Sequence, residues 1–314
     1  MEYSYRFRLY PTEAQEELMA KTFGCCRYVF NRFLDRRKTA YKETGTGLSY
    51  KECSKELTAL KKELPWLKEV DATALQASLK NLDRAYKNFF TGLKAGRRVG
   101  YPQFKAKKRD IPSFKATNNK GTVAIVGHSI RLPKIGYVDC RISKQVNGEI
   151  LSATVQQAKS GKYYVAINCK NVDLPSMPAT GYVVGIDLGL KDLAITSDGE
   201  KFDNPHTYAK NQKKLARLQR QLSRKTKGSH NREKAKLRVA RLHEKIANQR
   251  NDALHKMTTK LVRENDVICM ENLSVKNLVK NRKLAKSIMD ASWGEVRRQL
   301  AYKTVWYGKE LVIV

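Results

Sequence analysis

The chain has 314 residues and carries 62 lysines and arginines against 30 aspartates and glutamates, which gives a formal net charge of +32. Such an excess repels itself in the folded state unless a polyanion neutralises it, so a nucleic acid is the expected partner. No apolar run approaches the roughly 20 residues that span a bilayer, and the N-terminus lacks the apolar segment of a signal peptide. The composition therefore argues against a membrane protein and favours the cytoplasm.

The six cysteines are scattered along the sequence and form no CxxC pair. This spacing fits neither a zinc site nor a disulfide framework, so we expect reduced and mostly buried thiols. They are Cys25, Cys26, Cys53, Cys140, Cys169 and Cys269.

The N-terminal third is predicted to be one strand followed by helices. Residues 3–9 alternate in strand fashion, and Pro11-Thr12 end that strand and open a helix that runs to about residue 44. A second helical block covers residues 50–94 and is broken by Pro65-Trp66. Its apolar stripe is expected to be core and consists of Leu75, Leu79, Leu82, Tyr86, Phe89 and Phe90.

Several basic and aromatic residues of this part are candidates for contact with nucleic acid. Gln76, Lys80 and Arg84 share a helix face beside the apolar stripe. The glycine-rich segment 94–109 mixes cations with aromatic rings, which suits backbone tracking and base stacking, although a solvated linker is the alternative. The candidate contacts are Arg27, Asn31, Gln76, Lys80, Arg84, Arg97, Arg98, Tyr101, Phe104 and Lys105.

Residues 111–175 are predicted to be all-β, as in a small barrel. Short β-rich runs are separated by glycine, proline and asparagine turns. The runs are 123–126, 129–132, 137–142, 150–156 and 163–169, and the LPSMP segment 174–178 marks a boundary after them.

The stretch 182–200 places an acidic residue at the end of a strand. A β-branched run leads to Asp187, Gly189 stands where a tight turn needs it, and a second strand at 193–196 closes on the turn 197–199. A carboxylate on a buried central strand is costly unless a cation or a donor meets it. Three interpretations stay open here: an ordinary hairpin, the phosphate turn of an actin-like ATPase, or the first metal ligand of an RNase H-like nuclease.

The last third adds a basic helical pair and a second acidic strand end. Residues 210–263 are predicted to be a helical hairpin, which is either a solvated arm or a contact for a nucleic-acid backbone. The short apolar strand 267–270 then puts Glu271 at its C-terminal end, before a basic loop, a helix over 292–307 and a last strand. Two carboxylates at two strand ends favour convergence on a divalent metal.

Five sequence blocks, in order along the whole chain, resemble the TnpB/OrfB family of insertion-sequence proteins. This family comprises compact RNA-guided nucleases related to type V CRISPR effectors. The actin-like alternative loses support, because its other phosphate loops have no counterpart and the charge would be unexplained. The blocks are FRLYPT with Gln15 and GCCRYVFN, YPQFK, VVGIDLGLKDLAITSDG, MENLSVKNL, and KLAKSIMDASWGEVRRQLAYK.

The resemblance implies a multidomain α+β fold in four segments. Residues 1–10 are the first strand of a wedge domain, 11–110 a helical recognition domain, and 111–178 the β-barrel of the wedge domain. Residues 179–314 are a RuvC-like nuclease domain of RNase H fold, with the helical hairpin inserted at about 208–264.

The resemblance also implies the partners and the site. They are a guide RNA from the transposon end and target double-stranded DNA, of which the protein reads a short flanking motif and base pairing reads the rest. Asp187 and Glu271 correspond to the first and second metal-binding carboxylates, with Mg²⁺ as the cation. Gln76 lies in the helix that resembles the motif reader. The location implied is the bacterial or archaeal nucleoid.

One departure from the family pattern bears on catalysis. Family members normally continue into a zinc ribbon with two CxxC pairs and a third catalytic aspartate, neither of which is in this sequence, so we expect no zinc. Asp290, Glu295 and Glu310 are poor substitutes for that aspartate. We therefore expect guided binding with weak or absent cleavage, as in a repressor-like or trimmed form.

Three alternatives remain. The first is an active RNA-guided endonuclease with a two-metal mechanism. The second is a generic RNA-binding protein without guided targeting. A DNA-rearranging transposase has the least support, because the five histidines form no HxH pair.

Overall fold

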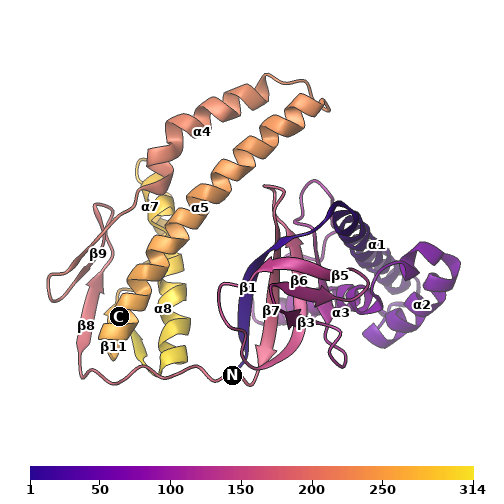
Figure 1. The fold of residues 1–314 in the computed structure, drawn as a ribbon, viewed down its shortest axis with the longest axis horizontal. Coiled ribbons are helices and arrows are strands. Elements are labelled where there is room, and N and C mark those ends of the chain that lie inside the picture. The colour runs from indigo at the N-terminus through magenta and orange to yellow at the C-terminus, as the bar shows by residue number, and fades with distance from the viewer. The chain divides into compact units, whose positions relative to one another are not determined.

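A computed structural model describes residues 1–314 as two compact units, Met1–Asp173 and Leu174–Val314 (Figure 1). The first unit holds the predicted helical segment together with the predicted β segment. The second holds the segment that resembles a nuclease. Both units combine helices with a sheet, which confirms the α+β class.

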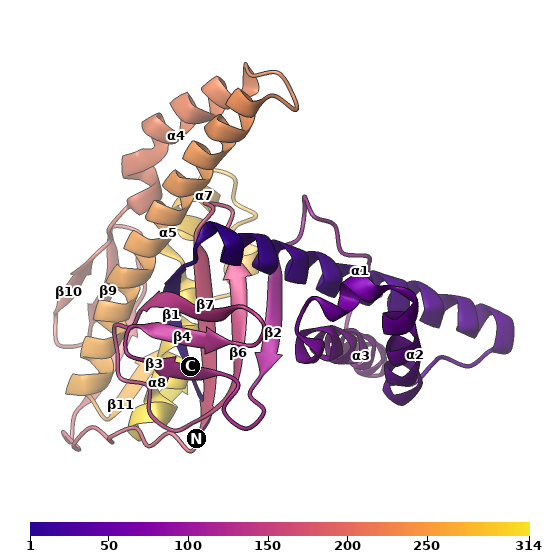
Figure 2. The ribbon, with the colours of Figure 1, turned by 45° about the vertical axis from the view of Figure 1, so that its right-hand side comes forward.

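The helical part of the first unit is organised by α1 and α3, which pack against each other (Figure 2). Thr12 and Ser49 open the first two helices with capping boxes, in which each hydroxyl meets the backbone of the third helical residue. Asp71 caps α3 in the same role. The elements are α1 (Glu13–Thr44), α2 (Tyr50–Glu63), the 3-10 turn η1 (Pro65–Lys68) and α3 (Ala72–Lys94).

The predicted apolar stripe of α3 is core over only its first half. Leu75, Leu79 and Leu82 are each at most 1% exposed. Phe90, in contrast, is 54% exposed, so the prediction that it is core was wrong. The stripe fails there because its C-terminal aromatic rings line an open cavity instead of packing inside the unit.

The sheet of the first unit is antiparallel and curled, in the order β2-β6-β7-β1-β5-β4-β3 (Figure 1). The N-terminal strand β1 therefore lies between two strands from the middle of the chain. Hydrogen bonds do not close this sheet into the expected barrel, because β2 and β3 remain edges. The strands are β1 (Tyr3–Tyr10), β2 (Ser113–Thr117), β3 (Ala124–Val126), β4 (Ser129–Leu132), β5 (Gly136–Arg141), β6 (Glu149–Gln157) and β7 (Tyr163–Lys170).

The second unit is built on a five-stranded mixed sheet, in the order β10-β9-β8-β11-β12. β8, β11 and β12 run parallel, whereas β9 and β10 complete an antiparallel meander with β8. The strands are β8 (Val183–Asp187), β9 (Asp192–Thr196), β10 (Lys201–Asp203), β11 (Val267–Met270) and β12 (Glu310–Ile313).

Helices α5 and α8 cover one face of that sheet. The core joins Val184 and Ile268 of the sheet to Leu254 of α5 and Val296 of α8, all at most 1% exposed. The predicted hairpin is formed by α4 and α5, which share a small apolar core of their own. The helices are α4 (Thr207–Ser223), α5 (His230–Glu264), α6 (Val275–Leu278), α7 (Ala285–Ala291) and α8 (Trp293–Tyr307).

The six cysteines are free, and five of them are buried, as the sequence predicts. None of the helices combines the length and the apolar character that crossing a membrane requires.

Candidate functional site

Asp187 and Glu271 stand side by side at the C-terminal ends of two neighbouring parallel strands. The register of β8 and β11 pairs Ile186 with Met270, so the next residue of each strand is an acid. Hydrogen bonds from Val314 to Met270 and from Asn272 to Val314 keep Glu271 in extended geometry. Because neighbouring strands are about 4.8 Å apart, the two carboxylates can reach a common cation.

Both carboxylates project from the sheet face that the helices leave open. Along β8 the buried residues Val184 and Ile186 alternate with the exposed residues Val183 and Asp187. Asp187 is therefore exposed, whereas the sequence suggested a carboxylate on a buried strand. Neither Asp187 nor Glu271 has a side-chain hydrogen bond or an ion pair, so all four carboxylate oxygens are available to a ligand.

The turn that follows Asp187 is fixed by close packing. A Cβ atom on Gly189 would lie 2.7 Å from the backbone oxygen of Asp192, so the turn has no room for a side chain. Trp293, which begins α8, donates its indole N–H to the Gly189 carbonyl at 3.3 Å. A hydrogen bond from the first residue of α8 thus stabilises the predicted tight turn.

Two adjacent carboxylates without partners fit a magnesium ion. Mg²⁺ commonly takes one or two carboxylates and completes its octahedron with water and substrate phosphate oxygens. No group of three or more His, Cys, Asp or Glu side chains in residues 1–314 is arranged to hold a metal ion. The candidate donor set within these residues is this pair of acids.

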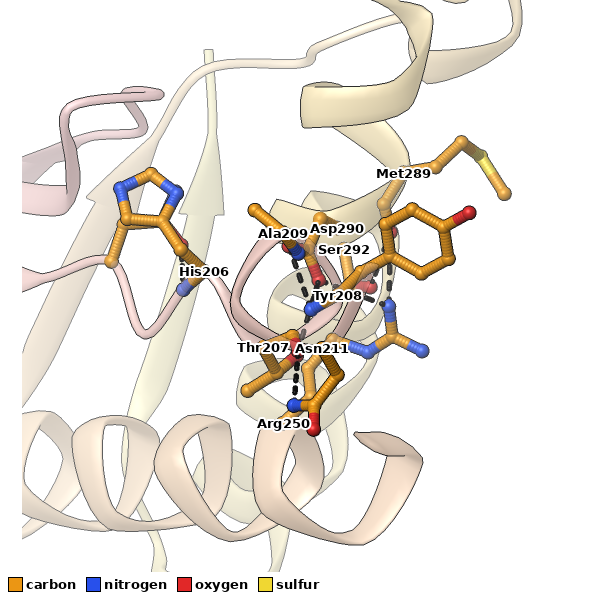
Figure 3. A network of polar contacts seen from close by, with 10 residues as sticks. His206, Thr207, Tyr208, Ala209, Asn211, Arg250, Met289, Asp290 and Ser292 are labelled. Carbon is orange, nitrogen blue, oxygen red and sulfur yellow. Dashed lines mark hydrogen bonds and ion pairs between the residues drawn. The ribbon is translucent and has the colours of Figure 1, made fainter. Parts of the chain in front are cut away.

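Asp290 has a structural task instead. Its carboxylate accepts hydrogen bonds from the Thr207 hydroxyl at 3.1 Å and from the backbone N–H groups of Tyr208 at 3.0 Å and Ala209 at 3.3 Å (Figure 3). These groups form the first turn of α4, which has no side-chain cap of its own. Arg250 of α5 adds an ion pair at 3.7 Å. Asp290 therefore ties α4, α5 and α7 together.

Glu295 is likewise committed elsewhere. It binds the guanidinium of Arg298 at 2.7 and 2.8 Å and accepts from the Gln299 amide at 3.0 Å. These bonds hold the pKa of Glu295 below its ordinary value, the Arg298 guanidinium being the main cause. Glu310 begins β12, at the end of the parallel strands opposite to the Asp187–Glu271 pair.

Gln76, Lys80 and Arg84 form an exposed row on α3. They are four residues apart, so they follow one face of the helix, and none of their side chains has a protein partner. These three residues are candidate contacts for nucleic acid.

Asn31, another predicted contact, has a structural task. Its side-chain amide donates to the Lys105 carbonyl at 2.9 Å and accepts from the Lys105 N–H at 2.7 Å. Both ends of the amide therefore fasten the basic segment to α1. The Lys105 ammonium lies 4.3 Å from the centre of the Phe30 ring, and burial lowers its pKa.

The remaining candidate contacts, from α1 and from the basic segment, differ in exposure. Arg97, Arg98 and Phe104 are exposed, whereas Arg27 is half-buried. Tyr101 is 40% exposed, but its hydroxyl is hydrogen-bonded to that of Tyr86 at 2.8 Å. Its ring therefore belongs to an aromatic cluster as well as to the surface.

A basic surface of the second unit lies at the tip of the α4–α5 hairpin. Arg232 donates to the carbonyls of Leu222 and Lys225 and so fixes the connection between the helices. A shallow hollow beside it is lined by the exposed cations Arg224, Lys225, Lys234 and Arg238. The sequence of this hairpin is compatible with a solvated arm or with a contact for a nucleic-acid backbone.

Comparison with known proteins identifies the family. Residues 164–282 match the IS605 OrfB family described as "Probable transposase". Two relatives are named "Putative RNA-guided DNA endonuclease", the second with the suffix InsQ. The Streptomyces pristinaespiralis protein is 40% identical over 99% of this chain and 77% of its own length. The Escherichia coli protein is 39% identical over 99% of this chain and 80% of its own length. The chain belongs to the TnpB-like family of RNA-guided DNA endonucleases.

Two further matches bear on the fold of this TnpB-like chain. A chain of the cryo-EM structure of a Cas12f1–sgRNA–target DNA complex covers all of it with a TM-score of 0.50 and 12% identity, over 89% of that chain, so the likeness concerns the fold alone. Residues 1–46 match a family described as "Helix-turn-helix domain". The structure has a strand and one long helix there, β1 and α1.

Proposed function

We propose that this chain binds a guide RNA and uses it to recognise double-stranded DNA beside a short flanking motif. The observation that carries the proposal is its membership of a family of RNA-guided DNA endonucleases, together with the free acid pair at the strand ends. The exposed cations on α3 and on the α4–α5 hairpin support it, because they supply the backbone contacts that such an assembly needs.

We further propose that Asp187 and Glu271 hold a divalent cation, with Mg²⁺ as the expected ion. Bound there, the ion would polarise a phosphodiester and activate water. The role of the chain is to fix two carboxylates on a rigid edge of the sheet. The Gly189 turn and the Trp293 indole support that rigidity.

For a polypeptide of residues 1–314 we expect guided binding with weak hydrolysis. Two-metal hydrolysis stabilises both the attacking and the leaving oxygen, which calls for more ligands than two carboxylates provide. No third protein ligand joins the pair within these residues. Binding of this kind with little cutting would suit a repressor.

The test of guided recognition is a comparison of two duplexes. The protein is purified with the RNA that it carries, and a labelled duplex matching that RNA is compared with a scrambled one at equal salt, each beside a randomised flank. We expect a tight shift for the matched duplex only. Equal binding of both duplexes would instead identify a generic nucleic-acid binder and would refute guided recognition.

The cation site is tested by titrating Mn²⁺, a spectroscopic substitute for Mg²⁺, and following the free ion by electron paramagnetic resonance. Asp187→Asn and Glu271→Gln should each weaken binding at least tenfold. Glu233→Gln is the matched control, because this exposed acid lies in α5 and pairs only with Lys236. Unchanged Mn²⁺ binding in both site variants would refute the assignment.

A further inference from the structure

The helical part of the first unit contains a cavity of about 580 Å³, and of its lining residues only Tyr101 is a predicted nucleic-acid contact. Its volume lies within the usual range of small-ligand pockets, about 300–1,000 Å³. It opens between the end of α1, the turn that follows α1, and the C-terminal half of α3. Five aromatic rings line it: Tyr41, Tyr86, Phe89, Phe90 and Tyr101.

Three of these rings are exposed at the cavity although they are large and apolar. Tyr41 is 64% exposed, Phe90 54% and Tyr101 40%. Such rings are normally covered in a folded protein, so a surface that collects several of them is a site for an aromatic or apolar partner.

The arrangement of the rings is fixed. Tyr101 packs edge-on against Tyr86 and Phe89, with ring centres 5.5 and 5.2 Å apart. A Cβ atom on Gly92 would lie 2.2 Å from a methyl carbon of Val99, so the chain after α3 folds back against the helix where only glycine leaves room. The cavity is therefore preformed.

One wall of the cavity is charged. Arg37 is 7% exposed, and its guanidinium donates to the Asp83 carboxylate at 3.2 Å and lies over the Tyr86 ring at 5.2 Å from its centre. Lys87, whose side chain is 76% exposed, pairs with the same carboxylate at 3.1 Å. The site thus offers hydrogen-bonding groups beside its aromatic faces and a cation at its rim.

We propose that this cavity receives one unpaired base of the bound RNA, stacked on Phe90 and Tyr41. The inference rests on the proposed function. Stacking on aromatic rings is sequence-tolerant, and the unpaired bases of RNA loops are available for it. Lys87 at the rim is placed to meet a neighbouring phosphate.

The charge of the chain favours RNA over the other possible occupants. A second copy of the chain would bring another +32 against the same surface. An apolar peptide would bring no anion to the exposed Lys87 ammonium at the rim, whereas a nucleotide offers both a base edge and a phosphate. The negatively charged occupant is the complementary one.

The first test locates the contact directly. The protein with its co-purified RNA is irradiated with ultraviolet light and digested, and mass spectrometry searches for nucleotide adducts. We expect an adduct on Phe89 or Phe90, within the tryptic peptide of residues 88–94. The second test is affinity: Phe90→Ala should bind the same RNA about tenfold more weakly at an unchanged salt dependence, because a stacked base and no phosphate contact is lost.

Leu93→Ala is the matched control, since Leu93 is 53% exposed on the same helix and does not line the cavity. Phe90→Tyr should retain wild-type affinity. RNA binding that is intact in Phe90→Ala, with no adduct on 88–94, would overturn the cavity inference and leave the proposed function standing. A Phe90→Ala variant that changes from dimer to monomer would identify a second copy as the occupant. Absence of any RNA binding by the wild type would overturn both.

Discussion

The acidic residues of the second unit take their roles from their surroundings. Asp187 and Glu271 have free oxygens at an open sheet face, whereas Asp290 is 6% exposed on its side chain and surrounded by donors. A buried carboxylate that satisfies several N–H groups stabilises the fold, and its removal leaves those donors unpaired. Free carboxylates at a strand edge add nothing comparable to stability.

Asp290→Ala should lower the free energy of unfolding by about 2–3 kcal/mol, because the Thr207 hydroxyl and the first N–H groups of α4 lose their acceptor. Hydrogen exchange should show the loss at the start of α4 before it shows elsewhere. The control Asp252→Ala removes an exposed pair with Lys256 and should change stability by less than about 0.5 kcal/mol. Full protection of α4 in Asp290→Ala would contradict this role.

Asp266 gives the second unit a pH dependence. Lys309 and the N–H groups of Thr180 and Gly181 hold the pKa of Asp266 well below its ordinary value, with Lys309 the largest cause. A lowered folded-state pKa means that the stabilisation is complete above the unfolded pKa of about 3.9 and is lost as the pH falls below it.

Asp266→Asn should therefore unfold at a lower temperature than the wild type at pH 7, and this difference should shrink towards pH 3. Thermal unfolding at both pH values measures it, with Asp252→Asn as an exposed control. A difference that stays constant between pH 7 and pH 3 would show that the Asp266 charge does not stabilise the unit.

At the scale of the element, the β8–β9 turn positions the candidate cation site. Gly189→Ala forces a Cβ atom against the Asp192 backbone and should cost about 1–3 kcal/mol, since the turn must shift. Gly185→Ala in strand β8 is the control, because the atom nearest to a Cβ at that position is 3.8 Å away. The stabilities of the two variants are compared by urea unfolding, with hydrogen exchange of the second unit as the readout. Equal stability of the two variants would refute the steric argument.

The α4–α5 hairpin is tested by its salt dependence. Replacing four cations at its tip by alanine should reduce the slope of log affinity for nucleic acid against log salt concentration by about 3. The control removes four lysines that already pair with acids and should change the slope by less than about 1. Equal changes would show that net charge alone matters. The tip residues are Arg224, Lys225, Lys234 and Arg238, and the controls are Lys21, Lys170, Lys236 and Lys256.

For the whole molecule, the patterns that could be predicted are those that local chemistry encodes. Proline, capping residues and apolar spacing marked most helices, and the two acids were found because each ends an apolar run. The short strands β2 and β10 and the helices α6 and α7 were not predicted, since their few residues carry no clear period.

What the sequence could not provide is the partner of each side chain. The sequence shows Asn31 only as a polar helix residue, whereas in the structure its side-chain amide is hydrogen-bonded to the backbone of Lys105. The aromatic cavity left one signal, the pair Phe89-Phe90. Neighbouring residues of a helix point about 100° apart, which is about the width of a typical apolar stripe, so one ring of such a pair lies at the margin of the core-facing side.

The exposure of Asp187 also depended on tertiary structure. Its strand is central in the sheet, which suggested burial, but helices cover only the opposite face. Which face of the sheet is open depends on where α5 and α8 pack, and this packing is a tertiary feature.

The most direct test of RNA-guided binding with weak cleavage is one gel. The protein with its own RNA is incubated in Mg²⁺ with a labelled matching duplex, alongside Asp187→Ala. We predict a shifted and largely intact duplex for both proteins, with any residual cutting only in the wild type. Efficient cutting would contradict the expected weak hydrolysis, cutting that survives in Asp187→Ala would contradict the carboxylate assignment, and loss of the shift in Asp187→Ala would contradict the separation of binding from the cation site.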